Sequence, residues 1–143
     1  MTARGSAAPR ATWPSLRLYM LYLIVAGTAG IGTSKLITDT VARSWRDCDA
    51  AGPGDGWILL LMWFPNAVAV GVWWVAVLLL GHRLGTRVPA LIRVPATLLL
   101  CLSGSLAALW IMMVWLHDPG GTIVHPVCPP GNTPPWWPTW VPL

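Results

Sequence analysis

The stretch WILLLMWFPNAVAVGVWWVAVLLLG, residues 57–81, contains 25 consecutive residues without a charged side chain. A second uncharged stretch of 23 residues covers 94–116, and a third of 17 residues covers 18–34. An apolar helix of roughly 20 residues crosses the ~30 Å core of a bilayer. Because a helix satisfies its own backbone hydrogen bonds in lipid, the three stretches predict an all-α integral membrane protein with three transmembrane helices.

The composition excludes two other classes of protein. Hydrophobic residues make up 55% of the 143 residues and charged residues only 10%, whereas soluble domains carry about 25% charged residues. So few charges cannot cover the surface of a soluble globular enzyme, and the high hydrophobicity argues against intrinsic disorder of the chain. The net charge of +4 does not indicate nucleic-acid binding, because the charges are divided between segments of opposite character.

The stretch 18–34 has two interpretations. It follows three arginines, and Gly27 and Ala29 have the small side chains and spacing of a signal-peptidase site, so it has features of a cleaved secretory signal. The apolar character, however, continues beyond Ala29 through Leu36 and Ile37. This continuation favours a retained transmembrane helix.

The flanking charges predict the orientation. Segments 1–17 and 82–93 each carry three arginines and no acid. The connection 35–56 carries three basic residues against four Asp, and the tail 117–143 has one Asp and no Lys or Arg. Because short cytoplasmic segments carry the excess of Lys and Arg, we expect a disordered cytoplasmic N-terminal tail, an antiparallel hairpin of the second and third spans around 82–93, and an external C-terminal tail.

This orientation gives the cysteines different roles. Cys101 lies inside the third span and is expected to be a small packing residue. Cys48 falls in the first external connection and Cys128 in the external tail, where disulfides persist in an oxidising compartment. We predict a Cys48–Cys128 disulfide, with two unpaired external thiols as the alternative.

The C-terminal tail is rich in proline and tryptophan. Residues 126–143 contain seven Pro together with Trp136, Trp137 and Trp140. Proline fixes φ and removes a backbone donor, so we expect an extended or polyproline II conformation. The three indoles either hold a small cap against the outer leaflet or recognise envelope sugars or a partner protein.

Pro65 and Asn66 interrupt the second span. Asn66 lies roughly 15 Å into the membrane, near its midplane. One interpretation is a kinked helix with Asn66 hydrogen-bonded to another helix, and the other is a polar point on a substrate or ion path. No charged side chain lies within a span, which weighs against a proton-coupled transporter.

Small residues recur at four-residue spacing in the spans, which favours close helix packing unless they are simply frequent in this chain. They are Ala26, Gly30 and Ser34; Ala67 and Gly71; Ser103 and Ala107; and Gly104 and Ala108.

No chemical motif stands out. The external residues that suit Zn or Cu are His117, Asp118, His125, Cys48 and Cys128. They lack a recognised ligand spacing, and a disulfide would remove the thiols, so we predict no metal or cofactor. Cys48 and Cys128 do not form a C-x-x-C redox motif, and no phosphate loop, nucleophile elbow or zinc-protease motif is present.

The sequence therefore predicts a small multi-pass plasma-membrane protein without enzymatic activity. Its expected role is structural or accessory, as a partner of a larger membrane complex or envelope component, with no nucleic-acid partner. Two alternatives are a homo-oligomeric transport or channel-like protein lining a path past Asn66, and an envelope enzyme using the external Cys and His residues. Eight Arg against one Lys indicate a GC-rich bacterial source.

Overall fold

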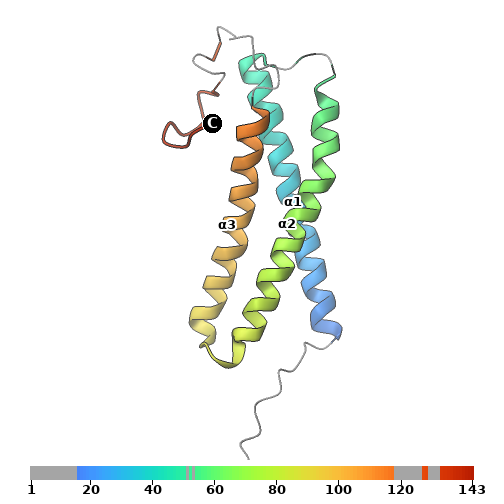
Figure 1. The fold of residues 1–143 in the computed structure, drawn as a ribbon, viewed down its shortest axis with the longest axis vertical. Helices are drawn as coiled ribbons and strands as arrows, with labels where there is room; N and C mark the ends of the chain where they lie inside the picture. The colour runs from blue at the N-terminus through green and yellow to red at the C-terminus, as the bar shows by residue number, and fades with distance from the viewer. Residues whose placement is uncertain (1–15, 51, 53, 118–126, 129–132) are drawn as a thin grey trace, which may run out of the picture.

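In the part of the chain that the structure describes, three α-helices and one short 3-10 helix form the fold (Figure 1). The computed structural model describes residues 16–50, 52, 54–117, 127–128 and 133–143. Helix α1 spans Leu16–Cys48, α2 spans Gly56–Arg83, η1 spans Leu84–Thr86 and α3 spans Ala90–Leu116. All three α-helices are long and apolar enough to cross a membrane, which confirms the predicted helical class and number of candidate spans. The expected disorder of the N-terminal tail concerns mostly residues 1–15, which lie outside the described part.

Each helix turns large apolar side chains away from the bundle. Leu61 in α2 is 67% exposed, and Leu91 and Leu99 in α3 are 87% and 67% exposed. A soluble protein rarely presents such continuous apolar surface to water. Lipid chains are the solvent that suits this surface.

Helix α1 continues well beyond residue 34, so most of the expected loop 35–56 is helical. One face of this continuation is apolar and buried at helical spacing, and the opposite face carries ion pairs between residues four apart. The buried side chains are Ile37, Val41, Trp45 and Cys48. The ion pairs are Lys35–Asp39 at 2.9 Å and Arg43–Asp47 at 3.4 Å.

Prolines mark the beginning of α3 without breaking it. Pro89 is the N-cap residue, where a missing backbone N–H has no partner inside the helix to lose. Pro95 lies in the second turn, where its nitrogen cannot donate to the carbonyl of Leu91, and α3 continues through it. Residues 84–89 reverse the chain between α2 and α3 (Figure 1). The predicted antiparallel hairpin of these two helices is therefore present.

Helices α1 and α2 approach each other closely along small residues. A Cβ atom on Gly30 would overlap the backbone oxygen of Ala67, and one on Gly71 would lie 3.5 Å from the backbone oxygen of Ala26. The hydroxyl of Ser34 donates to the carbonyl of Trp63 at 2.5 Å. The four-residue spacing in these two helices thus serves packing, as the sequence indicated.

Small residues in α3 act differently. Gly104 provides room for the indole of Trp73, whose Nε1 donates to the carbonyl of Leu100 at 2.9 Å. Ser103 and Ala107 are exposed on the outside of the bundle. Within the described chain, Gly104 packs against α2, whereas Ser103 and Ala107 of the predicted α3 packing face do not pack against another helix.

We predict that Gly30→Ala destabilises the bundle and that Gly32→Ala does not. The added methyl group at Gly30 meets the α2 backbone, and overpacking of this kind costs about 1–3 kcal/mol. A Cβ on Gly32 meets nothing within 4 Å, and alanine favours a helix over glycine by ~1 kcal/mol. Cys101 is buried and free, so the temperature at which it reacts with a fluorogenic thiol dye in detergent reports unfolding. Equal unfolding temperatures for the two variants would contradict the packing.

Candidate functional site

Most of the buried side chains lie at one end of the bundle. This end, here called the disulfide end, holds the C-terminal part of α1, the beginning of α2 and the end of α3 (Figure 1). Cys48 and Cys128 form a disulfide there between positions 80 residues apart, with Cα atoms 5.2 Å apart. Both cysteines are buried, and the indole of Trp45 donates to the carbonyl of Leu116. The disulfide and this hydrogen bond tie α1 to the tail and to α3.

Residues 133–143 fold back on the disulfide end through two turns. The amide of Trp137 donates to the carbonyl of Pro134 at 2.9 Å, and the amide of Val141 donates to the carbonyl of Pro138 at 3.0 Å. The expected extended or polyproline II conformation is therefore wrong for this segment. Proline favours the second position of a turn, which Pro135 occupies, and the reversals return the end of the chain to the buried cluster.

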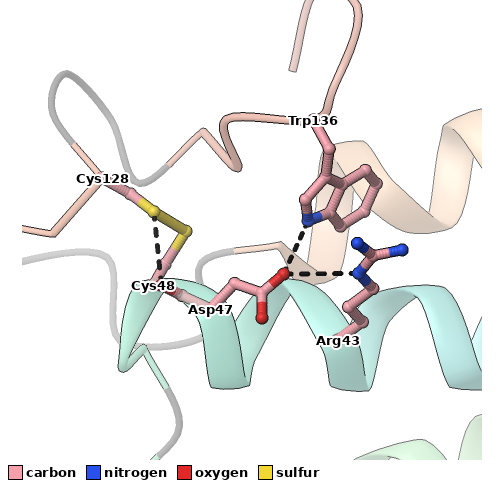
Figure 2. The surroundings of a disulfide bond; sticks show 5 residues. All are labelled: Arg43, Asp47, Cys48, Cys128 and Trp136. Carbon is pink, nitrogen blue, oxygen red and sulfur yellow. Dashed lines mark hydrogen bonds and ion pairs between the residues drawn. A yellow bond between two sulfur atoms is a disulfide. The ribbon is translucent and has the colours of Figure 1, made fainter.

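Helix α1 holds Trp136 through charge (Figure 2). The indole Nε1 donates to Oδ2 of Asp47 at 2.7 Å, and the same oxygen lies 3.4 Å from Nε of Arg43. The guanidinium carbon of Arg43 is 5.0 Å from the ring centroid of Trp136, a cation–π arrangement that contributes about 0.5–1 kcal/mol at exposed sites. This cluster fixes the tail on the polar face of α1.

The remaining tail indoles have different surroundings. Trp137 donates to the carbonyl of Val141 at 3.0 Å, and Trp110 of α3 donates to the carbonyl of Pro142 at 2.9 Å. Trp140, by contrast, is 83% exposed. Of the three indoles singled out in the sequence, two bind within the cap and Trp140 is presented outward.

The two ends of the bundle differ in charge. The end that contains η1, here called the hairpin end, also holds the beginning of α1. Its basic residues are Arg17, Arg83, Arg87 and Arg93. Within the described ranges, every Asp lies in the C-terminal part of α1 or between Cys48 and α2.

Asn66 is half-buried in α2, and its side chain forms no hydrogen bond with the described residues. Besides the hydrogen bonds of Ser34 and Trp73, polar contact between the helices is made by Ser105, whose hydroxyl accepts from Thr33 at 3.4 Å and from the indole of Trp74 at 3.1 Å. The interhelical hydrogen bond expected for Asn66 is thus absent from the described chain. Its place on a substrate or ion path stays a prediction.

A groove and a pocket between the helices were not predicted from the sequence. An apolar groove of about 640 Å³ lies between α1 and α2, with Trp63 and Phe64 among its lining residues. A smaller pocket of about 230 Å³ lies at the hairpin end, where Tyr22, His82 and Arg93 meet. Both depend on the rotation of one helix against another, which spacing along a single helix does not reveal. In the sequence, the pocket was indicated only by the polar residues His82 and Arg93 next to the uncharged stretches 57–81 and 94–116.

The residues considered as metal ligands do not gather in the described part of the chain. His117 Nδ1 lies 2.9 Å from the carbonyl oxygen of Met113, and the disulfide joins Cys48 to Cys128. Asp118 and His125 lie outside the described residues. Residues 16–50, 54–117 and the described tail segments contain no group of three or more His, Cys, Asp or Glu arranged to hold a metal ion.

Comparison with protein-family models, curated proteins and solved structures finds no match to this chain.

We predict that alkylation in intact cells followed by denaturation labels one cysteine without reductant and all three cysteines with it. The labelled thiol without reductant is Cys101, which is free and buried in the fold. Mass spectrometry of the alkylated protein counts the labels. A parallel Cys128→Ser variant should lose up to about 4 kcal/mol of stability, the chain-entropy figure for a loop of this length. Labelling of Cys48 and Cys128 without reductant would contradict the disulfide.

Proposed function

We propose that this chain is an accessory protein of a bacterial plasma membrane, acting as a partner of a larger membrane complex or envelope component. The observation that carries the proposal is the cap formed by residues 133–143 on the disulfide end. A disulfide, a charged cluster and indole hydrogen bonds hold the cap in one place. The cap therefore presents a fixed surface rather than a loose tail.

Trp140 is the contact point that this surface favours. An indole combines a large apolar area with few rotatable bonds, and tryptophan is enriched among residues that dominate binding interfaces. Its neighbours in the tail are already occupied within the chain, whereas Trp140 is 83% exposed. We propose that a partner, rather than this chain, covers its ring.

The proposed orientation places the hairpin end in the cytoplasm and the disulfide end outside. It rests on the arginines at the hairpin end, since cytoplasmic flanks carry the excess of basic residues. It also rests on the disulfide, since such bonds persist in oxidising compartments. The GC-rich bacterial source is inferred from composition alone, namely eight Arg against one Lys together with abundant Ala, Gly, Pro and Trp.

We predict that Trp140→Ala reduces the amount of co-purified partner in mild detergent about tenfold or more. Tryptophan residues at the centre of an interface contribute about 2 kcal/mol or more to binding. Trp115→Ala is the matched control, because Trp115 is 74% exposed but lies on α3, within an apolar stretch that suits lipid. Quantitative mass spectrometry of the purified complexes measures the partner.

Two outcomes of this experiment would contradict the proposal, the first its accessory role and the second the cap as the contact surface. One is recovery of the wild-type protein as a single copy without a stable partner. The other is equal loss of the partner in both variants, because this would place the contact on the apolar helices rather than on the cap.

A homo-oligomeric transport or channel-like protein is the second candidate. The observation that favours it is the half-buried Asn66, whose amide has no hydrogen-bond partner in the described chain. Three helices alone are too few to enclose a path, so this function requires several copies around the amides. It predicts an oligomer in native mass spectrometry that Asn66→Leu weakens and Val68→Leu, an exposed change on the same helix, leaves intact. A strictly monomeric wild-type protein would remove this candidate.

A further inference from the structure

The pocket at the hairpin end brings together one polar side chain from each α-helix. Tyr22 belongs to α1, His82 to α2 and Arg93 to α3. The phenol oxygen of Tyr22 lies 3.4 Å from Nδ1 of His82, and the two rings meet edge to face with centroids 6.2 Å apart. Three groups able to donate hydrogen bonds therefore border the same hollow.

Two glycines near the end of α2 leave room for side chains of α3, and one of these side chains is Arg93. A Cβ on Gly81 would overlap the side chain of Thr97, and a Cβ on Gly85 would overlap the guanidinium of Arg93. Gly81 and Gly85 are four residues apart, as are Arg93 and Thr97, so each glycine receives one α3 side chain. The missing side chain of Gly85 thus leaves room for the guanidinium against η1.

The guanidinium is not neutralised by an acid of the described chain. Within that part of the protein, the ion pairs are Lys35–Asp39 and Arg43–Asp47, both on α1 toward the disulfide end. Arg93 is half-buried at the opposite end. A partly desolvated cation without a carboxylate partner favours an anion supplied from outside.

The pocket also lies at the boundary between polar and apolar surface. His82 follows the last residue of the uncharged stretch 57–81, and Arg93 precedes the stretch 94–116. The other lining residues are Thr97, Gly81 and the apolar Leu78, Val94 and Leu98. A ligand here has an anionic group at the membrane surface and an apolar portion directed into the bilayer.

We propose that this pocket binds the phosphate group of an anionic phospholipid such as phosphatidylglycerol. Arg93 pairs with the phosphate, Tyr22 and His82 bind its remaining oxygens or the glycerol hydroxyls, and an acyl chain lies along the apolar wall. Basic pockets between helices at a membrane surface are suited to such headgroups, and guanidinium matches phosphate geometry better than ammonium does. At about 230 Å³ the pocket is smaller than sites for drug-sized molecules, which are about 300–1,000 Å³, so it holds the headgroup rather than the whole lipid.

The test uses the full-length protein in neutral detergent, with its unfolding temperature followed through Cys101. Short-chain phosphatidylglycerol, phosphatidylcholine of the same chain length and inorganic phosphate are titrated separately. Phosphatidylglycerol is expected to raise the unfolding temperature, phosphatidylcholine to raise it much less, and inorganic phosphate to have little effect. This pattern requires both the negative charge and the attached chain.

Variants then locate the site. Arg93→Gln is expected to raise the apparent Kd for phosphatidylglycerol about tenfold, because a charge-assisted hydrogen bond is lost. Arg87→Gln is the matched control, since Arg87 carries the same charge in the same hairpin but does not line the pocket, and its Kd should change less than about twofold. Tyr22→Phe keeps the ring and removes the hydroxyl, so it should weaken binding about threefold.

Three results would overturn the proposal. Equal weakening by Arg93→Gln and Arg87→Gln would show a diffuse charge effect without a site. Equal stabilisation by phosphatidylcholine would show that the chain alone binds, and equal stabilisation by inorganic phosphate would show a site for a soluble anion. If Arg93→Gln does not fold, unchanged lipid affinity in Tyr22→Phe overturns it instead.

Discussion

The contact between Gly30 of α1 and the backbone of Ala67 in α2 is the constraint on which the remainder of this bundle depends. Lipid chains are as apolar as leucine, so the hydrophobic effect gives helices in a membrane little reason to associate. Close van der Waals packing and interhelical hydrogen bonds must therefore hold the helices together. The absent side chain of Gly30 permits the approach, and the hydroxyl of Ser34 on the carbonyl of Trp63 adds a polar contact where water is scarce.

This packing has consequences at the disulfide end. With α1 fixed against α2, its continuation to Cys48 lies beside the end of α3, where Trp45 reaches the carbonyl of Leu116. The buried cluster that forms there contains Val41, Met113 and both bonded cysteines. The tail then has a surface to fold onto, and its turns, charged cluster and disulfide follow from that surface. The molecule is thus held by close helix contact in the spans and by a small core at one end.

The spans were predictable because the bilayer imposes a severe rule on sequence: about 20 residues without charge and a backbone that satisfies itself. The cysteine pairing could be predicted for a related reason, because Cys48 and Cys128 are the two cysteines outside the predicted spans. The conformation of the tail could not be predicted from the sequence. Seven prolines favour extended chain locally, but the buried cluster stabilises the reversals that begin at Pro134 and Pro138, and a tertiary surface of this kind leaves no periodic signal.

Arg93 shows why a residue's charge and its position carry different information. In the sequence it is one of the arginines from which the orientation is predicted, and that prediction depends only on which segment the arginine lies in. In the fold, Gly85 leaves room for its guanidinium against η1, and Arg93 lines the same pocket as Tyr22 and His82. An arginine needed only for orientation has no reason to be half-buried, because a solvated guanidinium serves equally well and avoids the cost of desolvation. The glycine that admits it therefore points to a second use of the same charge, and phosphate is the anion that the membrane itself supplies at this depth.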